Sequence, residues 1–371
     1  MRVFDMSRER MHLRRKPIFH ARIMPYIIRF CLYTDCAIKA IRLYSHDRFL
    51  VQSSLMFFYR RIIDKIKRES VRLKKGRIEI LLYHFVTEED NPFTVNAHLV
   101  RPDVFRAQMQ YVSKHYRVIS LNQVLEIMSG DGKDGPYVAV CFDDGYLNNI
   151  TEAYPILEEL KVPATIFVSP SIVNNADLLW REKIRYIVAT DLIDQCIDFL
   201  KSGAHADKYN FELLGRMTFY RWSKEKKAIT DMSIQDDLNK FFASRNISAA
   251  AIAAQHHLYA KKDDLHERAY LDFGNHTLTH PLMPCLTYKE QEEELHAAHT
   301  RLTDLGLTLD AFAAPFAAYN EDTVAICKQL GYHLVLDDGI LSNVIDGKKD
   351  AFRVLHRKLV PATLAELRAI I

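Results

Sequence analysis

The sequence contains short apolar runs that alternate with segments of helical periodicity. Three of these runs, at 78–83, 137–142 and 164–168, are almost entirely apolar. Strands that are buried on both faces of a parallel sheet have this near-continuous apolar character, whereas strands with one solvated face alternate. We therefore predict that the three runs are buried strands of a parallel sheet.

The segment between the second and third runs has the spacing of an amphipathic helix. Its apolar residues recur at roughly the helical period of about 3.6 residues, and Pro163 ends the pattern before the next strand. These apolar residues are Leu147, Ile150, Tyr154, Leu157 and Leu160. A strand–helix–strand unit joins parallel strands. With further strands predicted at 270–273, 312–316, 334–337 and 352–360, the expected fold class is α/β.

Segments that break this alternation define the expected domain organisation. Residues 1–76 are predicted to form a basic helical N-terminal arm, and residues 77–361 the α/β domain. A polar and mostly helical stretch at about 177–264 interrupts the strands and is interpreted as an inserted helical subdomain. Residues 362–371 are predicted to be a C-terminal helix.

The composition is that of a folded protein without a strong overall charge. Hydrophobic residues make up 49% of the 371 residues, which argues against disorder. The 50 Lys and Arg against 47 Asp and Glu give a net charge of +3, so charge alone predicts no nucleic-acid partner. The six cysteines form no C-x-x-C pair, and the sequence implies no disulfide framework.

Basic residues concentrate before residue 77, and two interpretations of this arm stay open. It could lie as an amphipathic arm on an anionic membrane surface, or pack on the domain with a solvated charged face. Pro25 and Arg29 interrupt its apolar stretch, so it is not a clean signal peptide. No stretch is long and uncharged enough to span a bilayer. We expect a cytoplasmic protein, either free or peripheral at the inner face of the membrane.

Two short motifs carry the candidate chemistry. The sequence C-F-D-D-G at 141–145 places two adjacent carboxylates at the end of an apolar run, and H-T-L-T-H at 276–280 places two imidazoles four residues apart. One carboxylate and two imidazoles can hold a divalent metal ion with positions open for water and substrate. The second carboxylate can then serve as a base.

Together these motifs resemble the polysaccharide deacetylase (NodB-homology) family of carbohydrate esterases, whose motifs read T-F-D-D-G and H-[ST]-x-x-H. Residues 82–84, 162–168 and 311–316 resemble further family motifs in the same order. The resemblance runs from about 77 to 361 and is broken by the insertion. It implies a distorted, incomplete (β/α) barrel with fewer than eight complete units. In such barrels the chemistry lies at the C-terminal ends of the strands.

The resemblance also implies a role for each site residue. Asp144, His276 and His280 would hold the metal ion, with zinc the first expectation and cobalt or nickel compatible with the same ligands. Asp143 would be the general base for attack of metal-bound water on an acetyl carbonyl. The backbone N–H of Phe316 would stabilise the resulting oxyanion.

The general acid is less clearly marked. The family places a late histidine in this role, and Val354-Leu355-His356 is the nearest match, which makes His356 the expected acid. In an alternative register, Arg357 matches the arginine of a Leu-Pro-Arg-like motif, and His84 is another candidate. The family's third motif often has an arginine that orients the base, but this chain has Ala313 there.

The function implied is a metal-dependent hydrolase that removes an acetyl group, N-acetyl above all, from a polysaccharide or oligosaccharide. The expected partner is thus an acetylated glycan. Alternatives are removal of another acyl group or an O-acetyl ester on the same fold, a catalytically weak carbohydrate-binding module, and a membrane-docked assembly factor. Non-haem iron oxygenases use similar ligands, but typically with a histidine before the carboxylate in a β-rich fold.

The insertion follows a strand and is therefore expected on the catalytic face of the barrel. It contains both tryptophans of the chain, Trp180 and Trp222. Their rings could stack on sugars if the insertion forms a cap over the metal ion, or they could fill the insertion's own core.

Overall fold

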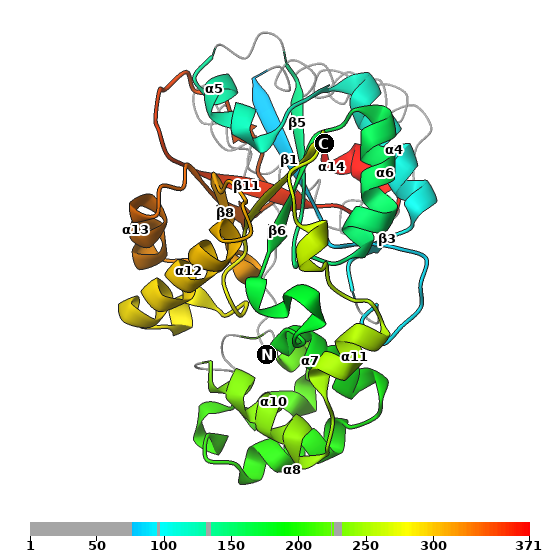
Figure 1. The fold of residues 1–371 in the computed structure, drawn as a ribbon, viewed down its shortest axis with the longest axis vertical. Coiled ribbons are helices and arrows are strands. Elements are labelled where there is room, and N and C mark those ends of the chain that lie inside the picture. The colour runs from blue at the N-terminus through cyan, green and yellow to red at the C-terminus, as the bar shows by residue number, and fades with distance from the viewer. Residues whose placement is uncertain (1–75, 95–96, 131–134, 224, 226–231) are drawn as a thin grey trace, which may run out of the picture. The chain divides into compact units, whose positions relative to one another are not determined.

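Seven parallel strands close into a barrel at the centre of the described structure (Figure 1). This computed structural model describes residues 76–371 except 95–96, 131–134, 224 and 226–231. Around the ring the strand order is β1, β11, β9, β8, β7, β6, β5 and back to β1. The bounds are β1 Arg77–Tyr83, β5 Tyr137–Phe142, β6 Ala164–Val168, β7 Leu271–Asn275, β8 Ala311–Ala313, β9 Leu334–Asp338 and β11 Arg353–Leu359. The expected α/β fold, a barrel with fewer than eight complete units, is confirmed.

Shorter strands extend the ring. β10 (Asn343–Val344) pairs antiparallel with β1, and β4 (Arg117–Val118) pairs parallel with β5. β2 (Phe85–Val86) and β3 (Leu99–Val100) form a separate parallel pair. All residues of β5 and β6 are buried, as the near-continuous apolar runs predict for strands covered on both faces.

Side chains alternate between the barrel interior and the layer beneath the outer helices. Along β1, Ile80 and Leu82 belong to one buried cluster, while Leu81 and Tyr83 belong to another that includes residues of the surrounding helices. The same alternation holds for every strand, and it decides below which side chains reach the site.

Helices surround the barrel (Figure 1). They are α4 Pro102–His115, α5 Val124–Met128, α6 Tyr154–Leu160, α12 Tyr288–Thr303, α13 Glu321–Gln329 and α14 Leu364–Ile370. The helix predicted from the pattern at 147–160 begins instead with a π-helical turn, Asn149–Ala153, that leads into α6.

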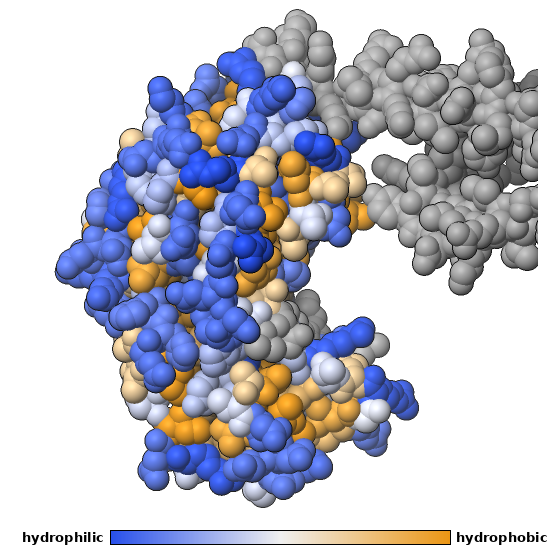
Figure 2. Space-filling view, turned by 90° about the vertical axis from the view of Figure 1, so that its right-hand side faces the viewer, coloured by the Kyte–Doolittle hydropathy of each residue, from blue (hydrophilic) through white to orange (hydrophobic). Residues whose placement is uncertain are grey.

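The stretch at 177–264 forms a helical subdomain next to the barrel (Figure 1). Its helices are α7 Trp180–Ala189, α8 Ile193–Ser202, α9 Phe219–Trp222, α10 Ser233–Ser244 and α11 Ala249–Gln255. They enclose a core of their own, in which Trp222, Leu238 and Phe241 are fully buried. Seen from the side, the surface is hollowed between the barrel above and these helices below (Figure 2).

The arm predicted at 1–76 lies outside the described residues, apart from Gly76. Among the helices that the structure describes, none combines the length and the apolar character needed to cross a membrane.

Candidate metal centre

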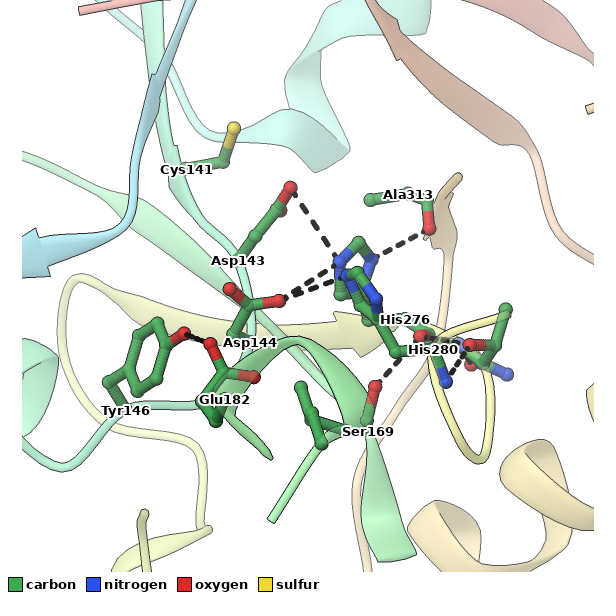
Figure 3. Close-up of polar contacts among 12 residues, drawn as sticks. Cys141, Asp143, Asp144, Tyr146, Ser169, Glu182, His276, His280 and Ala313 are labelled. Atoms are coloured by element: carbon green, nitrogen blue, oxygen red, sulfur yellow. Dashed lines mark hydrogen bonds and ion pairs between the residues drawn. The ribbon is translucent and has the colours of Figure 1, made fainter. Parts of the chain in front are cut away.

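The three predicted metal ligands come together at one end of the barrel (Figure 3). Asp144 lies just beyond the end of β5, and His276 and His280 lie in the loop that starts directly after β7. The carboxyl ends of parallel barrel strands meet at the same end, so two distant motifs become neighbours. One ligand atom from each residue lies within 4.8 Å of the others, and all three residues are buried.

The two separations from the Asp144 carboxylate to the imidazoles fit ligands of one metal ion. Nε2 of His276 lies 3.4 Å from Oδ1 of Asp144, and Nε2 of His280 lies 3.2 Å from the same oxygen. Ligands at about 2.0–2.2 Å from a tetrahedral zinc ion are about 3.3 Å apart. Oδ1 of Asp144 is buried and has no hydrogen-bond partner, which is costly for a carboxylate unless a cation balances it. The residues present therefore fit a divalent ion.

Neighbouring groups set the charge states of these ligands. Burial alone would raise the pKa of Asp144, but the two imidazoles hold that pKa well below its usual value. Burial would lower the pKa of His276, but the carboxylates of Asp143 and Asp144 outweigh this and raise it. Nδ1 of His276 lies 2.9 Å from the carbonyl oxygen of Ala313. The carbonyl can only accept a hydrogen bond, so the proton sits on Nδ1 and Nε2 is left to bind a metal.

The loop after β7 has a backbone conformation that its residue types do not favour. Thr277 has φ of 65° and His280 has φ of 64°, and each such left-handed residue costs on the order of 1–3 kcal/mol. Buried hydrogen bonds hold this conformation. The N–H of Thr277 donates to Oδ1 of Asn275 at 2.7 Å, and the N–H of His280 donates to Oγ1 of Thr277 at 3.0 Å. The strain is thus compensated by contacts that aim both imidazoles at Asp144.

Asp143 lies beside the cluster and is held by Arg357. The guanidinium donates to both carboxylate oxygens, at 2.6 and 2.9 Å, and Nε2 of His276 lies 3.8 Å from Oδ2. Burial alone would raise the pKa of Asp143, but the charge of Arg357 outweighs it and the pKa is lowered. Asp143 is therefore ionised at neutral pH and rigidly oriented. Arg357 supplies the orienting arginine that the sequence lacks at Ala313.

His356, the expected general acid, does not reach the cluster. Successive strand residues point to opposite faces, so β11 directs Arg357 into the barrel and His356 away from it. Nδ1 of His356 lies 2.6 Å from Oδ1 of Asp337 on the neighbouring strand β9. The structure thus corrects the assignment of His356 and favours the alternative register, in which Arg357 is the matched residue.

Phe316 and His84 lie close to the cluster. Phe316 follows β8, has φ of 56°, and its ring centroid lies 4.7 Å from that of His280. His84 directly follows β1, and its buried Nδ1 has no hydrogen-bond partner. Burial lowers the pKa of His84 to about 4 against the opposing effect of the Asp144 and Asp143 carboxylates. The ring is therefore neutral at pH 7.

Helix α7 of the insertion adds residues that sequence reasoning missed. The hydroxyl of Tyr146 donates to Oε1 of Glu182 at 2.8 Å, beside Asp144 (Figure 3). Nη1 of Arg185 donates to the same oxygen at 2.7 Å, while burial raises the pKa of Glu182 despite the charge of Arg185. The sequence predicts only a polar and mostly helical stretch here, and the interleaving of charged and apolar residues in α7 does not indicate that the charged side chains are buried.

Neither tryptophan of the insertion is available to stack on a sugar. Trp180 is 3% exposed and Trp222 is fully buried. Of the two interpretations, the structure supports core packing for Trp222. Trp180 instead contacts the loop at 276–280 that carries both histidines, here called the metal loop. Its Nε1 donates a hydrogen bond to the carbonyl oxygen of His280 at 2.9 Å.

Comparison with known proteins links this site to one family. The sequence model described as polysaccharide deacetylase matches residues 130–197 and 236–335, which include both motifs. YxkH of Bacillus subtilis (strain 168), classed with the polysaccharide deacetylases, is 26% identical over 114 residues. That match covers 30% of this chain and 39% of YxkH, so it spans less than half of the relative.

Solved structures that match this chain include the deacetylase PplD of Streptococcus pyogenes in complex with acetate. It is 19% identical, with 79% of this chain and 96% of that chain covered and a TM-score of 0.47. IcaB from Ammonifex degensii is 16% identical, with 80% and 95% covered and a TM-score of 0.48.

Proposed function

Because the chain belongs to the polysaccharide deacetylase family, we propose that it is a metal-dependent hydrolase that removes acetyl groups, N-acetyl groups first, from a polysaccharide or oligosaccharide. The observation that carries this proposal is the buried cluster of Asp144, His276 and His280, in which both imidazoles face one carboxylate oxygen that has no hydrogen-bond partner. A divalent ion held there would lower the pKa of a bound water and polarise an acyl oxygen.

The residues around the cluster supply the remaining chemistry. Asp143 would accept the proton of the attacking water, and its bidentate contact with Arg357 supports this role because it keeps the carboxylate ionised and oriented. The backbone N–H of Phe316 is the candidate donor to the oxyanion. His84, neutral at pH 7, would receive the proton that Asp143 takes from the attacking water and pass it to the leaving amine. It replaces His356 as the candidate for this role.

Acetate release from a panel of acetylated oligosaccharides tests the proposal. We expect the zinc- or cobalt-loaded protein to release acetate from N-acetylhexosamine oligomers. We also expect His276→Ala to lose both metal binding and acetate release, because it removes one of three ligands. His356→Gln is the matched control and should keep both, since its side chain points away from the cluster.

The alternatives give different results in the same assay. Release from O-acetylated but not N-acetylated sugars would identify an esterase. Glycan binding without acetate release would identify a carbohydrate-binding module. Full zinc occupancy in His276→Ala would refute the ligand assignment.

A further inference from the structure

Two helices of the insertion contact the loop that carries the paired histidines. From α7, Nε1 of Trp180 donates to the carbonyl oxygen of His280 at 2.9 Å. From α10, Nε2 of Gln235 donates to the carbonyl oxygen of Thr279 at 3.0 Å. Successive carbonyl groups of the metal loop are therefore held by side chains that lie outside the barrel.

These carbonyl groups belong to the part of the loop that orients His280. His280 adopts the left-handed conformation, with φ of 64°, and rotation of the peptide bonds on either side would redirect its imidazole. A buried carbonyl group without a donor costs on the order of 1–3 kcal/mol. Loss of either donor would thus favour other loop conformations in which the carbonyl group reaches water.

Ring packing couples the same tryptophan to the loop after β8. The Trp180 ring centroid lies 5.6 Å from that of Phe316, which in turn lies 4.7 Å from that of His280. Trp180 therefore contacts the metal loop through its indole N–H and the Phe316 turn through its ring.

We propose that Trp180 and Gln235 are positioning residues, through which the insertion fixes the conformation of the 276–280 loop and so sets the affinity for the metal ion. This inference rests on the proposed function for the identity of the ligand. It assigns the insertion a role inside the metal centre in addition to any role in covering it.

Trp180→Phe tests the inference, because it removes the indole N–H and keeps an aromatic ring. Trp222→Phe is a matched control: its Nε1 also donates to a backbone carbonyl oxygen, that of Asn210 at 2.8 Å, but within the insertion's own core. Zinc affinity would be measured by calorimetry. Hydrogen exchange of peptides covering 276–285 would be measured in the metal-free proteins, so one readout does not depend on the metal ion.

For Trp180→Phe we expect zinc affinity to fall by about 10-fold or more, as is typical when groups that orient metal ligands are removed. Exchange in 276–285 should become faster. Trp222→Phe should leave both readouts close to the parent protein. Gln235→Met, which keeps the length of the side chain but removes its N–H donors, should shift both readouts in the same direction as Trp180→Phe.

Two results would overturn the inference. One is a Trp180→Phe protein with the zinc affinity and exchange of the parent. The other is an equal loss in Trp180→Phe and Trp222→Phe, which would indicate general destabilisation of the insertion. If the parent binds no zinc but Trp180→Phe alone speeds exchange in the loop, the positioning role stands and the proposed metal-dependent function fails.

Discussion

The contact between Asp143 and Arg357 shows how a single residue sets the charge state of the proposed base. Both side chains are buried, and the pairing is bidentate, the geometry in which an arginine fixes a carboxylate most firmly. The guanidinium keeps Asp143 ionised in an environment that would otherwise favour its protonated form. Removal of Arg357 should therefore change both the charge state and the orientation of the Asp143 carboxylate.

We predict that Arg357→Met lowers kcat/KM by more than about 100-fold, since loss of a general base typically costs 10²–10⁴-fold. Without the guanidinium, burial dominates and the pKa of Asp143 rises, so the acid limb of the pH profile should move to higher pH. Leaving a buried carboxylate unpaired should also cost about 3–5 kcal/mol of stability. Activity assays between pH 4 and 9 and denaturant unfolding would measure these effects.

Arg353→Met provides the control for this prediction. Arg353 lies on the same strand, β11, but pairs with Asp346 near the surface. It should change kcat/KM little and leave the pH profile in place. A profile in Arg357→Met that keeps the acid limb of the parent would contradict the assigned role.

Zinc binding should strengthen as pH rises from 6 to 8, because the raised pKa of His276 makes a proton compete with the metal ion for Nε2. The raised pKa of His276 also stabilises the folded metal-free protein. This stabilisation is fully present below the pKa of a histidine in the unfolded chain, about 6.5. It is lost as the pH rises through the higher pKa of His276 in the folded protein. Calorimetry in buffers of different ionisation enthalpy would count the protons released. The same affinity at pH 6 and 8 would contradict this prediction, and His356→Gln should leave the pH dependence unchanged.

At the scale of elements, the sequence predicted the strands well, because strands buried on both faces consist of near-continuous apolar runs. The runs at 137–142 and 164–168 correspond to β5 and β6 residue for residue. The Asp-Asp motif after β5 and the His motif after β7 then located the candidate metal ligands, since strand ends of a barrel share one face. The local sequence pattern was therefore sufficient to place a residue whose position depends on a single strand.

The errors arose where the result depended on contacts between elements. Val354, Leu355 and His356 give no local sign of which side chain enters the barrel, and only the parallel pairing of β11 with β1 and β9 decides it. The π-helical turn at Asn149–Ala153 keeps the apolar spacing of a helix, so periodicity alone did not reveal it. The role of Trp180 depends on a loop 100 residues away in sequence.

At the scale of the described domain, the insertion and the barrel share packed contacts near the site. The ring of Tyr146, from the loop after β5, stacks on Phe85 with centroids 3.8 Å apart and on Tyr259 at 5.7 Å. The N–H of Ala260 donates to the carbonyl oxygen of Gly145 at 3.1 Å. Because the end of the insertion is bonded to the Asp-Asp-Gly turn, the two parts are expected to unfold together.

Tryptophan fluorescence can test this coupling, because both tryptophans of the chain lie in the insertion while the candidate metal ligands follow strands of the barrel. A ligand that binds only the folded state stabilises it by about 2.7 kcal/mol at a free concentration 100 times Kd. We predict that zinc at this level shifts the denaturant midpoint seen by fluorescence to higher concentration, and that His276→Ala abolishes the shift. A fluorescence transition unaffected by zinc, in a protein that demonstrably binds it, would show that the insertion unfolds independently. The predicted cooperativity would then be wrong, and the hydrogen bonds from Trp180 and Gln235 to the 276–280 loop would have to break before the metal centre unfolds.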